Sequence, residues 1–175
     1  MRKLSFIVII VLFSFSYSVT YSWEDGGTIL GFDGNVSNPL NVGTTDGVTP
    51  YDGDYMLSVS ESPLSGTPKA YLAYIQNLNP GDVVTASFYG YDTTDGSPSL
   101  RIWGAYVSGT DITSSQGSAG GNNTYTDGTG WSQITHSWTI SDGKEALAVE
   151  ARLYSATGGN DPTVYYIDLI DVTAP

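Results

Sequence analysis

From Trp23 onward, short apolar runs alternate with polar clusters, and no segment repeats its apolar residues at a helical spacing. The runs are rich in β-branched and aromatic residues and are bounded by Gly, Asp, Asn and Ser, which is typical of strands. The pattern predicts strands at about residues 22–24, 29–32, 55–60, 70–76, 82–91, 99–106, 132–140, 147–154 and 164–172. About nine strands in one domain predict an all-β fold, a β-sandwich of two antiparallel sheets.

Turns explain most of the breaks between these runs. Asp-Gly occurs at seven places, where glycine tolerates a positive φ and aspartate hydrogen-bonds its own turn. Residues 108–130 are the one long polar stretch, rich in Gly, Ser, Thr and Asn, and are predicted to be a loop. Loops of that length in compact domains are either functional or disordered.

Alternate positions in three of the predicted strands separate an apolar face from a mixed one. The apolar positions are expected to face the core: Val84, Ala86, Phe88, Leu100, Ile102, Tyr106, Leu147, Val149, Ala151 and Leu153. The opposite positions are expected to point outward: Tyr89, Tyr91, Arg101, Trp103, Glu150, Arg152 and Tyr154. If the three strands share a sheet, these outward side chains form one surface.

Such a surface has the chemistry that sugar recognition requires. Pyranose rings stack their C–H faces on flat aromatic rings, and planar charged groups hold the sugar hydroxyls. The alternative is that loops or the second sheet cover this face and that its aromatic residues belong to the core.

The N-terminus has the pattern of a secretory signal. Arg2 and Lys3 precede an apolar run over residues 4–13 that is too short to span a bilayer. We expect the protein to be secreted, at the cell surface or free outside the cell. The alternative is an uncleaved N-terminal anchor.

The end of this signal sets the start of the mature chain. Small residues allow cleavage after Ser18 or after Ser22, and the strand-like segment that follows favours the second. The prediction is a signal peptide at residues 1–22 and a single domain at residues 23–175. Cleavage there leaves 153 of the 175 residues, enough chain to bury a core.

Charge limits the partners of this domain. Losing the signal removes two of the six Lys+Arg residues, so four remain against 18 Asp+Glu, and the formal charge falls from −12 to −14. This charge repels nucleic acid and anionic membranes, and it suits a neutral ligand or a cation. We therefore expect neither nucleic acid nor, after signal cleavage, a membrane as a partner.

The chain lacks the residues on which most catalytic sites depend. It has no Cys, so core packing or a bound metal must replace disulfides in the exported fold. Its one histidine, His136, lies on the apolar side of its strand, which predicts a buried or half-buried side chain. A glycosidase needs two carboxylates across a cleft, for which Glu150 would have to pair with Asp92 or Asp95. We expect no enzyme, and glycoside hydrolase is the one class left open.

Three short motifs span nearly the whole of the predicted domain. Trp23-Glu24-Asp25-Gly26 opens it, Asp52-Gly53-Asp54-Tyr55-Met56-Leu57-Ser58-Val59 forms an early strand, and Tyr165-Tyr166-Ile167-Asp168-Leu169-Ile170-Asp171-Val172 closes it. Together they resemble a carbohydrate-binding module of the family 4 and 9 type, within the galactose-binding-like jelly-roll group. The resemblance implies a jelly-roll topology and a polysaccharide or oligosaccharide partner.

The resemblance also implies a structural Ca²⁺ ion between the first and last strands. Glu24 and Asp168 occupy the matching positions, and an oxygen from residues 46–54 would complete the shell. Ile170 separates Asp168 from Asp171 where the family commonly has adjacent aspartates, so Asp171 is left out of the site. The alternative is that both carboxylates are ordinary solvated strand ends.

The function expected from these features is non-catalytic carbohydrate binding through an aromatic sheet face. The alternative from a different class is a structural or adhesive surface protein that uses the same face for protein contacts. A small jelly-roll glycosidase is the third reading.

Overall fold

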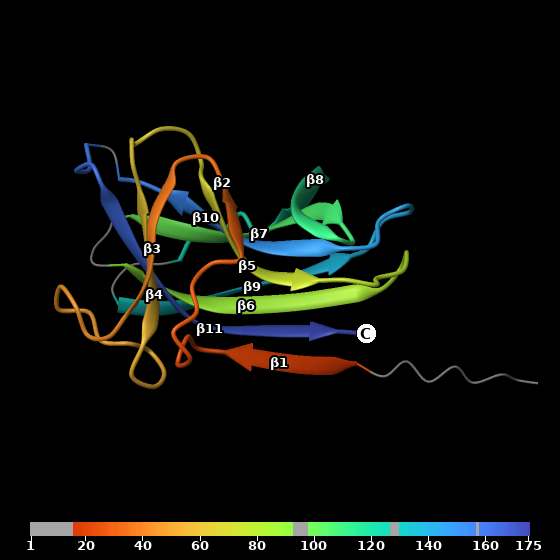
Figure 1. The fold of residues 1–175 in the computed structure, drawn as a ribbon, viewed down its shortest axis with the longest axis horizontal. Helices are drawn as coiled ribbons and strands as arrows, with labels where there is room; N and C mark the ends of the chain where they lie inside the picture. Colours follow the sequence, from red (N-terminus) through yellow and green to blue (C-terminus); the bar gives the residue numbers. More distant parts are fainter. Residues whose placement is uncertain (1–15, 93–97, 127–129, 157) are drawn as a thin grey trace, which may run out of the picture.

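The computed structural model describes residues 16–92, 98–126, 130–156 and 158–175, and they form a sandwich of two antiparallel sheets (Figure 1). Sheet A contains β1 (Tyr17–Tyr21), β3 (Val36–Val42), β4 (Met56–Glu61), β6 (Val83–Asp92), β9 (Gly130–Thr139) and β11 (Thr163–Ala174). Sheet B contains β2 (Gly31–Asp33), β5 (Lys69–Ile75), β7 (Ser99–Ser108), β8 (Asp111–Gly121) and β10 (Leu147–Tyr154). No helix in the described ranges is long and apolar enough to cross a membrane.

The chain passes from one sheet to the other at almost every connection. Sheet A has the order β3-β4-β11-β6-β9, with β1 beside β11, and sheet B has the order β2-β5-β10-β7-β8. From β4 to β7, consecutive strands therefore alternate between the sheets, as do β9, β10 and β11. This jelly-roll arrangement confirms the predicted fold class, and it places strands that are neighbours in sequence on opposite sides of the core.

The predicted core is confirmed. All ten side chains expected to face inward on β6, β7 and β10 are buried and belong to the main hydrophobic cluster between the sheets. Trp23, Tyr165 and Met56 are among the largest fully buried side chains. The period-two alternation therefore identified the correct face of each of the three strands.

Three strands were not predicted, and one predicted strand is wrong. Residues 22–24 form a turn, where Trp23 has a φ of 62° and its carbonyl accepts a hydrogen bond from Gly26 N. The unpredicted strands are β1, β3 and β8. Strand β8 lies inside the stretch expected to be a loop, because its small polar side chains face solvent and show no apolar alternation.

Strand β1 lies within the segment predicted to be a signal peptide. It pairs antiparallel with the end of β11, from Tyr17 opposite Ala174 to Tyr21 opposite Ile170, and the two strands run side by side near the C-terminus in Figure 1. Cleavage after Ser22 would remove this strand, whereas cleavage after Ser18 would remove only its first two residues. The rest of the predicted signal, residues 1–15, lies outside the described residues.

Candidate functional site

Five of the seven predicted ligand-binding residues lie together on the face of sheet B that points away from the core. In the register of β7 and β10, Trp103 lies opposite Glu150, and Arg101 lies opposite Arg152. Tyr154 follows two positions further along β10 on the same face. Two adjacent strands therefore bring charged and aromatic side chains into direct cross-strand contact.

The other two predicted residues lie on the opposite side of the molecule, so the assumption of a shared sheet was wrong. Tyr89 and Tyr91 belong to β6, which pairs with β9 and β11 in sheet A. There Tyr51 stacks on Tyr89 with ring centroids 3.6 Å apart, and Trp131 packs against the edge of Tyr91. Alternation along a strand shows which side chains point outward, but it does not show which sheet the strand joins.

The guanidinium groups on sheet B stack on its aromatic rings. The Arg152 guanidinium carbon lies 3.9 Å from the ring centroid of Trp103, whose Nε1 donates to Ser118 Oγ at 2.8 Å. The Arg101 guanidinium carbon lies 3.6 Å from the ring centroid of Tyr125. One face of Trp103 is therefore covered by arginine, which limits its predicted role as a stacking platform.

Tyr125 is an aromatic residue of this face that the sequence analysis missed. It packs edge-on against Tyr154 with ring centroids 5.0 Å apart, and 41% of its surface is exposed. Its position between β8 and β9, inside the stretch expected to be a loop, concealed its relation to β10.

Strand β8 covers part of the outer face of sheet B. Although β8 and β2 are at opposite edges of the sheet, Ile112 and Thr113 of β8 lie against Gly31 of β2. Beneath the strand is a small apolar cluster that includes Tyr71, Ala105, Val107, Ala146 and Ala148. The element that covers this part of the face is a strand of the same sheet, and not a loop or the second sheet, while Trp103, Arg101 and Tyr154 remain partly exposed.

Glu150 lines a polar cavity under β8 with a volume of about 60 Å³. The residue is 2% exposed, and its Oε2 lies 3.9 Å from Arg152 Nε. Burial raises the pKa of Glu150 from 4.5 to about 7, although the charges of Lys69 and Arg152 favour its ionised form. Lys69 Nζ also contacts Asp33 Oδ2 at 2.6 Å, and this contact holds the pKa of Asp33 below its usual value.

Three further residues of this cavity, Asp33, Lys69 and Tyr71, were not predicted as site residues. Tyr71 lies opposite Glu150 across β5 and β10, and Lys69 lies opposite Arg152. Extending the alternation analysis to the predicted strand at 70–76 would have indicated Tyr71. The Asp33-Gly34 pair was interpreted only as a turn.

The two predicted calcium ligands hold one loop through its backbone. Glu24 Oε1 accepts hydrogen bonds from Asp54 N and Tyr55 N, both at 3.0 Å. Asp168 is fully buried, and its Oδ2 accepts hydrogen bonds from the backbone N–H groups of residues 51 and 52 at 2.8 and 3.0 Å. Burial raises the pKa of Asp168, although the amide hydrogen bonds oppose this shift.

Backbone hydrogen bonds use part of the oxygen lone pairs that a calcium ion at these residues would need. Amide hydrogens bond to Oε1 of Glu24 and to both carboxylate oxygens of Asp168, and Ca²⁺ requires six to eight oxygen ligands. Within the described ranges, no three His, Cys, Asp or Glu side chains are placed to hold a metal ion. Ca²⁺ at Glu24 and Asp168 stays a prediction, and no step below depends on it.

The described residues do not form the predicted glycosidase pair. Asp92 is on β6 in sheet A, so it does not face Glu150, and Asp95 lies outside the described residues. His136 is half-buried and packs edge-on against Trp138 with ring centroids 4.9 Å apart. Burial lowers the pKa of His136, in agreement with a packed histidine.

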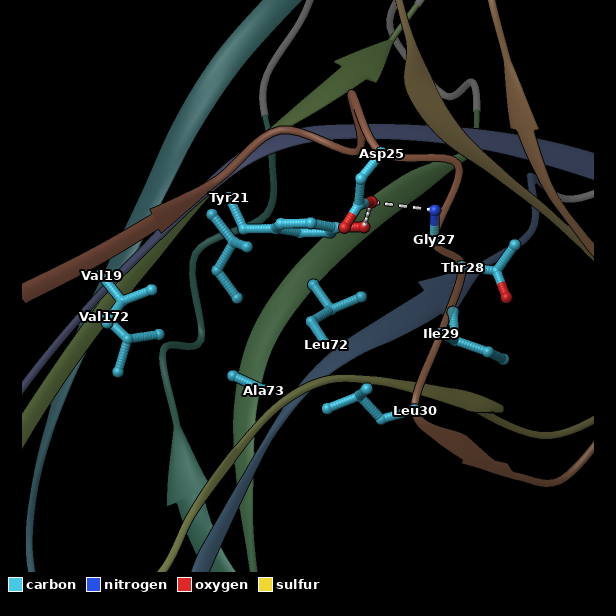
Figure 2. Close-up of a pocket in the computed structure, with 11 residues that line it drawn as sticks. Val19, Tyr21, Asp25, Gly27, Thr28, Ile29, Leu30, Leu72, Ala73 and Val172 are labelled. Carbon is cyan, nitrogen blue, oxygen red and sulfur yellow. Dashed lines mark hydrogen bonds between the residues drawn. The ribbon is translucent and has the colours of Figure 1, made fainter.

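A larger and mostly apolar cleft of about 460 Å³ lies between β1, the end of β11 and β5 (Figure 2). Leu72 and Ala73 line it from β5, while Val19 and Val172 line it from the paired strands β1 and β11. Burial raises the pKa of Tyr21 to about 12, and the hydrogen bond that its hydroxyl donates to Asp25 adds to this shift. Removing β1 would open this cleft on one side.

Comparison with solved structures shows the same fold in carbohydrate-binding modules. The chain is similar to the CBM22-1 and CBM22-2 xylan-binding domains of Xyn10C from Paenibacillus barcinonensis, with TM-scores of 0.55 and 0.57 and 16% identity to each. The alignments cover 89% and 90% of this chain and 92% and 99% of the two domains. The relation to family 4 and 9 modules stays a prediction, because these neighbours belong to another module family.

Two other solved structures extend the comparison. TmCBM61, solved with beta-1,4-galactotriose, has a TM-score of 0.51 and 12% identity, over 86% of this chain and 92% of that one. The K3 cleaved adhesin domain of Lys-gingipain from Porphyromonas gingivalis has a TM-score of 0.50 and 11% identity, over 90% and 98%. No protein-family model and no curated sequence matches the chain. At these identities, the likeness shows a shared β-sandwich fold.

Proposed function

We propose that this chain is a secreted, non-catalytic carbohydrate-binding protein that holds a polysaccharide or oligosaccharide on the outer face of sheet B. The observation that carries the proposal is the register of β7 and β10, which brings Arg101, Trp103, Glu150 and Arg152 together on one face. Rigid strands hold these groups at fixed separations, as recognition of a sugar requires.

Each part of the face has a separate task in this proposal. The exposed ring of Tyr125, with Tyr154 at its edge, offers the apolar surface on which a pyranose packs. The guanidinium groups of Arg101 and Arg152 offer planar sets of donors for hydroxyl oxygens. The fold shared with modules described as xylan-binding or bound to galactotriose supports a ligand of this class.

The geometry around Glu150 favours binding without hydrolysis. A raised pKa is what a general acid needs, and Asp33 in the same cavity keeps a lowered pKa. However, the cavity of about 60 Å³ has room for a few water molecules and not for a sugar ring. Wild-type protein incubated with xylan or galactan should release no oligosaccharides; release that Glu150→Gln abolishes would establish a glycosidase instead.

Calorimetric titration with soluble xylan, galactan and glucan tests the binding proposal with two matched variants. Tyr125 is 41% exposed beside sheet B, and Tyr51 is 44% exposed beside sheet A. Tyr125→Ala should weaken binding by about tenfold, and Tyr51→Ala should leave it unchanged. Absence of binding to all three polysaccharides would contradict the proposal, and loss of binding in Tyr51→Ala alone would move the site to sheet A.

Adhesion through protein contacts is the second candidate. Exposed apolar side chains on two sheet edges favour it, since Phe32 on β2 is 56% exposed and Val19 on β1 is 54% exposed. Edge strands with such side chains can pair with another chain. This candidate predicts oligomers that grow with protein concentration in sedimentation experiments and show no response to sugar.

A further inference from the structure

Basic residues are rare in the described part of this chain, and three of the four form one row across sheet B. After Lys3, the sequence has only four Lys+Arg residues against 18 Asp+Glu. Three of the four are in direct register on adjacent strands: Arg152 on β10 lies opposite Lys69 on β5 and opposite Arg101 on β7. We name Lys69, Arg152 and Arg101 the cationic row.

Like charges placed directly opposite one another destabilise a sheet, so the row needs compensation. The charge of Lys69 is compensated by the carboxylate of Asp33, whose Oδ2 lies 2.6 Å from Lys69 Nζ. Arg152 has the Glu150 carboxylate at 3.9 Å, whose pKa burial raises to about 7, and a weaker electrostatic interaction with Asp33. Arg101 forms no ion pair with any residue in the described ranges. Within the part of the chain that the structure describes, the row therefore has fewer carboxylate partners than cations.

The two arginines also keep unused hydrogen-bond donors. Nε of Arg101 and Nε of Arg152 are buried and have no hydrogen-bond partner in the described part of the chain. Their flat faces are occupied by Tyr125 and Trp103, but stacking engages the π face and leaves the in-plane N–H groups free. The buried Nε atoms are out of a ligand's reach, so an oxyanion at the exposed edge of either guanidinium group would bind through the terminal Nη groups and balance the charge there.

We propose that the cationic row binds the anionic group, carboxylate or sulfate, of an acidic polysaccharide whose neutral units lie along the same face. This rests on the proposed function and names the ligand class for that site. The 18 acidic residues argue against nucleic acid, in which a charge recurs about every 1.7 Å. A polysaccharide with occasional anionic groups places one of them on the row and keeps the remaining charges away from the acidic surface.

Matched pairs of polysaccharides test this proposal by calorimetry at pH 7 and low salt. Glucuronoxylan is compared with neutral xylan, and a sulfated galactan with neutral galactan, so that carboxylate and sulfate are separated. We expect at least one acidic member to bind about tenfold more tightly than its neutral partner, and salt to weaken only that preference. A preference for only one acidic polysaccharide shows whether the row binds carboxylate or sulfate. A preference for both shows that the row binds either anionic group.

Variants show whether the row carries the preference. Arg101→Gln should remove it, Arg101→Lys should restore part of it, and melting curves confirm that each variant is folded. Lys144→Gln is the control, because Lys144 is the fourth cation and is not part of the row: its Nζ donates to Gln116 O and lies over the ring of Tyr106. Equal affinity for acidic and neutral members, or a preference that survives Arg101→Gln, would overturn the inference and leave the proposed function standing. Failure of every polysaccharide to bind would overturn both.

Discussion

Replacing Glu150 with glutamine should stabilise the protein at alkaline pH and remove part of its pH dependence. Glu150 is 2% exposed, and its nearest cation, Arg152 Nε, is 3.9 Å from its Oε2. Burial moves the pKa of this carboxyl from 4.5 to about 7. That difference corresponds to a cost of about 3 kcal/mol for keeping the ionised form in the folded protein.

The direction in which stability changes with pH depends on whether the folded or the unfolded state binds more protons. In the unfolded chain the Glu150 carboxyl loses its proton near pH 4.5, whereas the folded protein keeps it up to about pH 7. Between these values the folded state binds more protons, so stability falls as pH rises through this window. The full cost of about 3 kcal/mol is present above pH 7 and is absent below pH 4.5.

Urea denaturation of wild type and Glu150→Gln across pH 4 to 9 measures this effect. The difference in free energy of unfolding, variant minus wild type, should rise by roughly 3 kcal/mol between pH 4.5 and pH 8, because glutamine cannot ionise. Any constant offset from the changed hydrogen bonding cancels in this slope. A difference that does not vary with pH would refute the proposed cost of ionising Glu150 in its cavity.

Three further predictions concern the carboxylates and the first strand. Asp168→Asn should lower the free energy of unfolding by about 1–3 kcal/mol, because the buried acceptor of two loop amides is weakened; unchanged stability in urea would contradict this role. A chelator should leave the melting midpoint unchanged if amides alone serve Glu24 and Asp168, and a midpoint that falls and returns with calcium would restore the predicted metal site. A chain that begins at Trp23 should melt below one that begins at Tyr17, because it lacks β1 and leaves the edge of β11 unpaired; equal midpoints would show that β1 adds nothing.

The fold class and the core could be predicted because they depend on local alternation. Val84, Leu100 and Leu147 each mark the buried side of a strand. Because successive side chains in a strand point to opposite faces, one buried residue fixes which of its neighbours are also buried. Sheet membership depends on which strand pairs with which, and this is not encoded in one strand alone. Tyr89 therefore has the predicted outward direction but belongs to the other sheet.

The site was predicted only in part for two physical reasons. Strand β8 is held by backbone pairing with β7 and has few apolar side chains, so composition made it look like a loop and concealed Tyr125. Strand β8 also covers Glu150. The pattern of residues along β10 does not show that a strand distant in sequence will cover one of its faces. The cationic row likewise depends on the register between β5, β7 and β10, which only the paired strands define.

The central claim, that a glycan lies on the outer face of sheet B, is tested most directly by NMR of the indole N–H groups. Trp103 Nε1 donates to Ser118 on sheet B, and Trp131 Nε1 donates to Thr49 O beside sheet A, so the two signals report opposite faces. When a soluble glycan is added, the Trp103 indole signal should shift with saturation and the Trp131 signal should stay in place. A shift of Trp131 with Trp103 unchanged, or no shift of either, would contradict the claim.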